Sequence, residues 1–226
     1  MHPHGVLTYA MALSFATDAL DFARKFPGIK ARGSTLEHLF HVPFQREIYL
    51  WLGAVAVTRE SFDWILSGNE GVGNAIVVCP GGAKEAIYAM PGTFTVNIKK
   101  RKGFIRMALR HGADLVPVIA FGENEVYARL DQSRHRMVKV IEQTLTKVFD
   151  ILHLSFPIFY GRFGPIPYRN QITTIVGRPI RVEEVVHEPT SDQVEALFET
   201  YSQELIKLYN EHKSKYGHEH IPIEFV

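Results

Sequence analysis

The feature that most constrains the fold is a short β-branched run that ends in a glycine turn. Residues 75–79 (Ala-Ile-Val-Val-Cys) are all apolar, and Pro80-Gly81-Gly82 follows them directly. A run of this length, bounded by turn-forming residues, predicts a buried strand. Residues 115–121 predict a second buried strand, and a helical pattern at residues 103–111 lies between the two. Strands that alternate with helices indicate an α/β fold with a mainly parallel sheet.

The same alternation continues along the chain. Helical periodicity predicts helices at residues 6–24, 47–52, 61–66, 136–152 and 194–209. We expect Ser61 to be the N-cap of the third of these. Apolar runs predict further strands at residues 54–57 and 173–176. Because no linker divides the chain, we expect one domain over residues 1–226. Its fold is expected to be a layered α/β fold, with a mainly parallel central sheet flanked by helices.

Composition limits the class of protein. The chain has 226 residues, of which 46% are hydrophobic and 22% charged, and its formal net charge is +1. This is ordinary globular usage, and no basic field favours nucleic acid. Cys79 is the single cysteine, which excludes an intrachain disulfide and fits a reducing compartment. The sequence shows no signal peptide and no uninterrupted apolar run of about 18 residues, so we expect no transmembrane helix.

The N-terminal segment His2-Pro3-His4-Gly5 is the first candidate site. Pro3 favours an extended backbone at His2, and Gly5 permits a corner where an extended segment becomes a helix. Backbone N–H groups at a helix start disfavour the imidazolium, and a neutral histidine suits a general base. A frayed chain end and an adventitious metal site are the alternatives. A structural zinc site needs four ligands, and Cys79 is the only cysteine that could join His2 and His4.

The turn after residues 75–79 is the second candidate site. Gly81 and Gly82 let a ligand approach the backbone closely and leave N–H groups to bind an anion. Lys84 and Glu85 follow, so that Lys84 can meet a charge and Glu85 can orient a histidine. The segment lacks the Gly-Lys-Ser/Thr ending of a P-loop. The alternative is a tight structural turn.

Two further segments are candidate ligand-binding sites. The first is a run of four consecutive cations that precedes a predicted helix: Lys99, Lys100, Arg101 and Lys102. Cations and a helix N-terminus both stabilise phosphate, although a solvated basic loop is the alternative. The second is the pair Glu123 and Asn124, which follows the predicted strand at residues 115–121. The alternative for this pair is that it caps the next helix.

Several common catalytic signatures are absent from the sequence. It contains no Gly-x-Ser-x-Gly, no His-Glu-x-x-His and no Gly-x-Gly-x-x-Gly. Serine-nucleophile, zinc-protease and dinucleotide-binding functions therefore lack support. His38 and His41 share a face if helical, but no third ligand is in view, which favours structural histidines.

Taken in order, these segments resemble the diacylglycerol acyltransferase type 2 family, which includes monoacylglycerol and wax-alcohol acyltransferases. The segments that carry the resemblance are residues 2–5, 80–85, 101–104, 112–118, 121–124, 161–164 and 176–180. The resemblance covers essentially the whole chain. It implies transfer of a fatty acyl group from acyl-coenzyme A (acyl-CoA) to the hydroxyl of a diacylglycerol, a monoacylglycerol or a long-chain alcohol. The implied location is the endoplasmic reticulum membrane and lipid droplets.

The sequence departs from the family pattern at its start. Family members usually carry a hydrophobic membrane hairpin before the histidine motif, and only Met1 precedes the motif here. His187 and Asp192 also form a His-x-x-x-x-Asp pattern that glycerolipid acyltransferases use. No glycine-rich strand turn follows that pattern, so we interpret it as coincidental.

These observations predict direct acyl transfer without a covalent enzyme intermediate. His4, or His2 as second choice, takes the proton of the acceptor hydroxyl, and Glu85 orients the imidazole. Backbone N–H groups near Gly5 or the Gly81-Gly82 pair stabilise the oxyanion. No metal or tightly bound cofactor is needed, and acyl-CoA is a co-substrate. The residues expected to hold it are Gly81, Gly82, Lys99, Lys100, Arg101, Lys102, Glu123 and Asn124.

The expected partners are acyl-CoA, a glycerolipid or fatty alcohol, and a membrane surface. Residues 151–166 favour membrane contact, because aromatic rings prefer the headgroup region. The rings in this segment are Phe156, Phe159, Tyr160 and Phe163. Packing of these rings into the core is the alternative. Two other functions also remain open: a lysophospholipid acyltransferase, and a truncated module that binds acyl-CoA or lipid without turnover.

Overall fold

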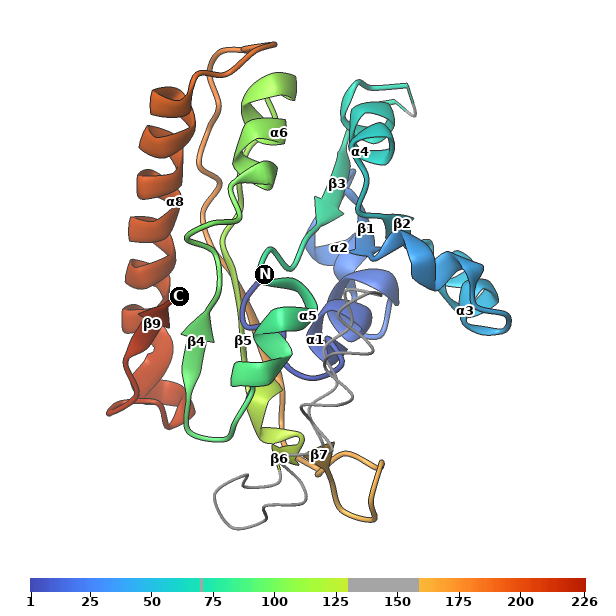
Figure 1. Ribbon diagram of the computed structural model, residues 1–226, viewed down its shortest axis with the longest axis vertical. Coiled ribbons are helices and arrows are strands. Elements are labelled where there is room, and N and C mark those ends of the chain that lie inside the picture. The colour runs from blue at the N-terminus through green and yellow to red at the C-terminus, as the bar shows by residue number, and fades with distance from the viewer. Residues whose placement is uncertain (70, 130–158) are drawn as a thin grey trace.

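The computed structural model describes residues 1–69, 71–129 and 159–226 (Figure 1). Helices and strands are mixed along the chain, as the sequence predicts. Helix α6 (Gly103–His111) and strand β8 (Thr173–Val176) have the predicted bounds. The predicted helix at residues 136–152 lies outside the described residues.

The largest sheet in the described part of the chain has three parallel strands. Strand β1 (Lys30–Thr35) lies between β2 (Val55–Ala56) and β3 (Asn74–Val77). The register pairs Ser34 with Val55 and Gly33 with Val77. Strand β3 ends two residues before the predicted end, because the chain turns there towards helix α5 (Gly82–Glu85).

The other strands form three pairs. They are β4 (Phe94–Val96) with β9 (Ile223–Phe225), β5 (Val118–Phe121) with β8, and β6 (Ala128–Arg129) with β7 (Phe159–Tyr160). The first pair is parallel and the other two are antiparallel. Parallel pairs, which the sequence predicts, thus occur in small sheets. The pairing of β4 with β9 brings the C-terminal end of the chain beside its middle.

The single helix predicted at residues 6–24 is wrong. The chain instead forms α1 (Tyr9–Met11), the π-helix η1 (Ala12–Ala16) and, after a break, α2 (Phe22–Lys25). The break falls at Thr17, which has an extended backbone with φ −122° and ψ 160°. Its hydroxyl donates to the carbonyl of Leu13 at 3.1 Å. A threonine side chain that bonds to nearby backbone competes with continuation of the helix.

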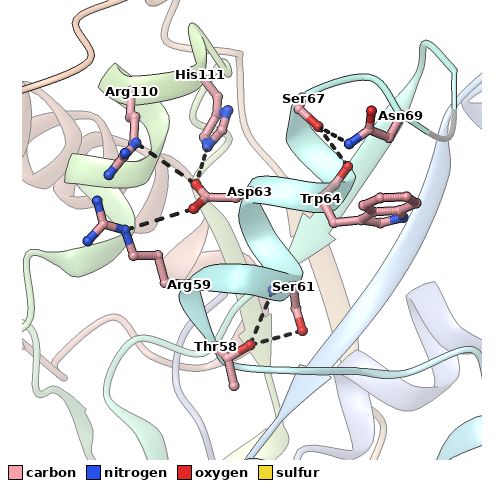
Figure 2. A network of polar contacts seen from close by, with 9 residues as sticks. All are labelled: Thr58, Arg59, Ser61, Asp63, Trp64, Ser67, Asn69, Arg110 and His111. Atoms are coloured by element: carbon pink, nitrogen blue, oxygen red, sulfur yellow. Dashed lines mark hydrogen bonds and ion pairs between the residues drawn. The ribbon is translucent and has the colours of Figure 1, made fainter.

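Side-chain caps set the starts of two helices. Helix α4 (Arg59–Leu66) begins after Thr58, whose hydroxyl oxygen accepts the N–H of Ser61 at 3.2 Å (Figure 2). The expectation that Ser61 is the N-cap is therefore wrong, because Thr58 reaches the free N–H first. Helix α8 (Ser191–His212) starts with a capping box between Thr190 and Gln193. Each such cap contributes about 1 kcal/mol.

The remaining helices are short. They are η2 (Glu37–His41), α3 (Gln45–Trp51), α5 (Gly82–Glu85), η3 (Ala86–Tyr88), η4 (Glu123–Glu125) and η6 (Lys213–Tyr216). Helix α3 projects from the body of the molecule (Figure 1). In the described part of the chain, no helix combines the length and the apolar character that crossing a membrane would require.

The main hydrophobic core lies under α8. Its buried side chains come from the middle strands, from α6 and from α8, and include Phe94, Val96, Ile98, Ile105, Ile119, Phe121, Phe198, Tyr201, Leu205 and Tyr209. Burying one such side chain stabilises the fold by roughly 1.5–3 kcal/mol. This core also holds the N-terminal segment, because His2 contacts both β5 and α8.

Candidate active site

The N-terminal segment is built into the fold. The N–H of His2 donates to the carbonyl of Val118 at 2.8 Å, and the N–H of Ala120 donates to the carbonyl of His2 at 2.8 Å. This parallel bridge fixes His2 beside strand β5. The alternative of a frayed end is therefore wrong, because the segment is hydrogen-bonded to β5.

His2 occupies a structural position. Its side chain is fully buried, and its Nε2 lies 3.0 Å from the hydroxyl of Tyr201 on α8. Burial holds the pKa of His2 well below its ordinary value. His2 does not line the large cavity described below.

The depressed pKa of His2 makes stability depend on pH. The unfolded chain takes up a proton at His2 below about pH 6.5, whereas the folded chain does not. The contribution of His2 is thus present above that pH and is lost as the pH falls. As the pH falls below about 6.5, we expect the unfolding free energy of the wild type to decrease relative to that of His2→Gln. The decrease is up to about 1.4 kcal/mol per pH unit. Denaturant titrations from pH 7.5 to 5 check this, and parallel profiles would contradict it.

His4 faces the cavity. Its Nδ1 lies 3.0 Å from the carbonyl oxygen of Gly5, which can only accept a hydrogen bond. Nδ1 therefore carries the proton, and the lone pair of Nε2 is available. Burial lowers the pKa of His4; the hydrogen bond to the Gly5 carbonyl opposes this shift, and the nearby charge of Arg101 adds to it. A neutral imidazole with a fixed tautomer is suited to accept a proton.

Glu85 holds the backbone of His4. Its Oε1 accepts the N–H of His4 at 2.6 Å, and its Oε2 accepts the N–H of Asn97 at 2.9 Å. The side chain is buried, and burial raises its pKa although both hydrogen bonds oppose the shift. The expected route of orientation is thus corrected: Glu85 positions His4 through its main chain, while the Gly5 carbonyl orients the ring.

The glycine turn is shaped by this carboxylate. A Cβ on Gly81 would lie 1.6 Å from Oε2 of Glu85, so a side chain at that position would displace the carboxylate. Gly82 has φ +56°, and a Cβ there would lie 3.3 Å from Nη1 of Arg101. Gly82 lines the cavity, whereas Gly81 is not part of its lining. The N–H of Gly82 already donates to the Cys79 carbonyl at 2.9 Å.

The four predicted cations have different surroundings. Arg101 lines the cavity. Lys102 forms an ion pair with Glu195 of α8, and its Nζ lies 4.8 Å from the centre of the Phe198 ring. Lys99 and Lys100 are exposed and lie outside the cavity lining. Among these cations, Arg101 is the one that the fold brings to His4.

Glu123 and Asn124 also lie outside the cavity lining. The two carboxylate oxygens of Glu123 accept the N–H groups of Tyr9 and Ala10, each at 2.8 Å. Burial raises the pKa of Glu123 to about 7. Asn124 donates to the carbonyl of Thr93 at 3.0 Å. Glu123 thus caps α1 rather than the helix that follows it in sequence, and it anchors the segment after Gly5.

The cavity has a volume of about 1030 Å³. Much of its wall is apolar, with contributions from Leu7, Met11, Leu39, Val42, Tyr49, Phe62, Phe104 and Met107. Sequence reasoning missed three cations in the wall: Arg59, Arg106 and Arg110. Arg106 and Arg110 stand four residues apart on a correctly predicted helix, which is the signal that could have found them. His187, interpreted above as part of a coincidental pattern, also lines the cavity.

A network of ion pairs joins helices α4 and α6 (Figure 2). Two of its members, Arg59 and Arg110, line the cavity. Asp63 of α4 lies 2.7 Å from Nε2 of His111 at the end of α6. Its carboxylate lies 3.9 Å from Nε of Arg59 and 4.0 Å from Nε of Arg110. Asp63 therefore keeps Arg59 and Arg110 close to each other from opposite helices.

Comparison with known proteins identifies the family of this chain. A family model described as diacylglycerol acyltransferase matches residues 1–225. Similar proteins include 2-acylglycerol O-acyltransferase 1 of Mus musculus, 42% identical over 222 residues that cover 96% of this chain and 65% of that protein. Diacylglycerol O-acyltransferase 2 of Homo sapiens is 38% identical over 225 residues, covering 96% of this chain and 56% of that protein.

The chain therefore spans between about half and two thirds of the length of these relatives. No solved structure matches it. The family match covers the histidine segment, the glycine turn and the cavity wall, so the chain belongs to the diacylglycerol acyltransferase family.

Proposed function

We propose that this chain transfers a fatty acyl group from acyl-CoA to the hydroxyl of a diacylglycerol, a monoacylglycerol or a long-chain alcohol. The observation that carries the proposal is His4, which has Nδ1 fixed by the Gly5 carbonyl and lines a large, mostly apolar cavity. The names of the relatives, O-acyltransferases of 2-acylglycerol and diacylglycerol, support it. We further propose one acyltransferase domain of layered α/β type over residues 1–226, because both chain ends pair with the middle of the chain.

The reaction follows from the position of His4. Nε2 takes the proton of the acceptor hydroxyl while that oxygen attacks the thioester carbonyl carbon. The new C–O bond forms and the carbonyl oxygen becomes an oxyanion. The C–S bond then breaks, coenzyme A leaves as a thiolate, and the imidazolium returns its proton to the sulfur or to water. Glu85 keeps the backbone of His4 in place throughout.

Arg101 is suited to stabilise the oxyanion. It lines the cavity beside Gly82, and its charge acts on His4. The N–H of Gly82 is already engaged with the Cys79 carbonyl, so a guanidinium N–H is the better donor. The contact of Arg101 with co-substrate phosphate, expected from the sequence, stays a prediction.

Direct transfer is favoured over a cysteine intermediate. Cys79 lines the cavity, but burial raises the pKa of its thiol to about 12. At neutral pH the thiol is therefore protonated, and a thiol is a poor nucleophile compared with a thiolate. The acceptor hydroxyl, activated by His4, is the better candidate.

An acceptor panel tests the proposed function. The chain is incubated with labelled oleoyl-CoA and, separately, with a diacylglycerol, a monoacylglycerol, a long-chain alcohol and a lysophosphatidate. Label in a neutral ester of one of the first three supports the proposal. Label only in the product of the lysophosphatidate favours a lysophospholipid acyltransferase. Tight binding of oleoyl-CoA without any ester favours a non-catalytic module.

We also propose contact with a membrane surface, at the endoplasmic reticulum and lipid droplets, because an apolar acceptor and product must enter and leave lipid. Two exposed aromatic side chains lie at the ends of helix α3: Phe44, its N-cap residue, is 85% exposed, and Trp51, its last residue, is 84% exposed. Helix α3 projects from the body (Figure 1). Its Gln45 and Tyr49 line the cavity. Aromatic side chains at such a site favour the interface.

The aromatic segment predicted for this contact has a mixed environment. Phe163 is 69% exposed, whereas the ring of Phe159 packs against Tyr127 with centroids 4.7 Å apart. Phe156 lies outside the described residues. Phe163 is therefore the described member of this segment best suited to contact a membrane surface.

Liposome flotation at low salt should detect this contact. We expect weak, reversible association of the wild type, and a several-fold smaller bound fraction for Phe44→Ser with Trp51→Ser, because two interfacial aromatic anchors are lost. Val72→Ser is the control, since Val72 is 99% exposed and lies in the loop between α4 and β3. Equal flotation of the double variant and the control would show that α3 is not the contact.

A further inference from the structure

One end of the cavity is cationic. Of the arginines in its wall, Arg101 stands beside Gly82, while Arg59 comes from α4 and Arg106 and Arg110 come from α6. Arg106 and Arg110 are four residues apart, so they share a face of the helix. These three arginines come from α4 and α6, which Asp63 joins, whereas His4 comes from the N-terminal segment beside β5.

Among the described residues, few carboxylates lie close to these arginines. Glu188 is the only carboxylate among the described residues of the cavity wall. Asp63 makes its short contact with His111 at 2.7 Å, and its distances of 3.9 and 4.0 Å to Arg59 and Arg110 lie at the limit of an ion pair. No described residue forms a hydrogen bond or ion pair with the side chain of Arg106. Cations clustered beside apolar wall favour an anionic ligand.

We propose that Arg59, Arg106 and Arg110 form a phosphate-binding subsite that holds the phosphates of acyl-CoA. This proposal rests on the proposed function and names the anchor of its donor substrate. Coenzyme A carries a pyrophosphate and a 3′-phosphate, separated from the thioester by the long pantetheine arm. Guanidinium groups bind phosphate through paired N–H donors. Phosphates at the α4–α6 end leave the apolar wall to the acyl chain and the thioester to His4.

The distance between the phosphate and the reacting atoms distinguishes coenzyme A from a lipid phosphate. In a lysophosphatidate, the phosphate is only a few bonds from the acceptor hydroxyl, so it would stand close to His4. Arg101 is the arginine beside His4 and Gly82. The three arginines on α4 and α6 are therefore better matched to phosphates that lie far from the reacting atoms.

The experiment measures binding directly by isothermal titration with two probes. Oleoyl-CoA carries the phosphates, and S-oleoyl-pantetheine has the same thioester and acyl chain without them. We expect Arg106→Gln with Arg110→Gln to weaken oleoyl-CoA about tenfold, which corresponds to about 1.4 kcal/mol, and to leave S-oleoyl-pantetheine within about twofold. Lys99→Gln with Lys100→Gln removes the same charge outside the cavity and should change neither affinity beyond about twofold.

Three results would overturn the subsite. They are unchanged binding of oleoyl-CoA by the arginine variant, equal losses for both probes, or a loss confined to a short-chain lysophosphatidate in a third titration. Arg106→Gln alone guards against misfolding, because Arg106 is exposed and Arg110 keeps its contact with Asp63. That single variant should lose several-fold affinity for oleoyl-CoA only. If the wild type binds neither oleoyl probe, the proposed function fails rather than the subsite alone.

Discussion

Replacing His4 with alanine is expected to lower the rate of acyl transfer by about 10²–10⁴-fold, the usual cost of losing a general base. The physical reason is the fixed tautomer: Nδ1 donates to the Gly5 carbonyl, so Nε2 is the group that can take a proton. Binding of oleoyl-CoA should stay close to that of the wild type, because the apolar wall is unchanged. Initial rates of coenzyme A release and titration of binding provide the two measurements.

The control for this substitution is His38→Ala, because His38 does not line the cavity and its variant changes the same residue type. We expect it to retain a rate within a few-fold of the wild type. If His4→Ala turned over at a similar rate, His4 would not be the base. If the control lost as much as His4→Ala, the effect would be one of folding.

Glu85→Ala is expected to have the second large effect. The carboxylate accepts two backbone N–H groups, at 2.6 Å from His4 and 2.9 Å from Asn97. Each buried N–H left without a partner costs about 1–3 kcal/mol, so the free energy of unfolding should fall by about 2–6 kcal/mol. The rate should fall as well, because the backbone of His4 is released. Chemical denaturation and initial rates measure the two effects.

Two companion variants separate charge from hydrogen bonding. Glu85→Gln keeps one acceptor oxygen and should fold better than Glu85→Ala while remaining slower than the wild type. Lys84→Ala is the neighbouring control, since Lys84 is exposed on the same short helix. A larger rate loss for Lys84→Ala than for Glu85→Gln, with both proteins folded, would reverse the assignment of the side chain that faces inward.

The fold shows which elements a local pattern can reveal. The sequence predicts helix α6 and strand β8 with their observed bounds, because each ends directly before a glycine, Gly112 or Gly177. Strand β1 was not predicted, since its sequence Lys-Ala-Arg-Gly-Ser-Thr has no apolar run. It is a strand because β2 and β3 supply hydrogen bonds on both sides. That information is in the tertiary pairing and not in the segment itself.

In the site, too, some features can be predicted from local sequence and others depend on tertiary contacts. His4 and Glu85 are marked locally, one by proline and glycine neighbours and the other by the turn after a strand. Their connection through the main chain of His4 depends on how the N-terminal segment lies beside β5. Arg59 could not be found from spacing, because it meets Arg110 only when α4 packs against α6 (Figure 2). Its position after a predicted strand makes Glu123 a candidate ligand-binding residue, whereas in the structure its carboxylate caps α1.

A single-turnover experiment tests the central claim most directly. The chain is mixed with oleoyl-CoA labelled in the acyl group and with an acceptor that the panel identifies, and the reaction is quenched at short times. Direct transfer activated by His4 predicts that label passes from thioester to acceptor ester, with one coenzyme A released per ester and no label on the protein. Label that appears first on Cys79 or another side chain, or coenzyme A release that does not need the acceptor, would contradict the account.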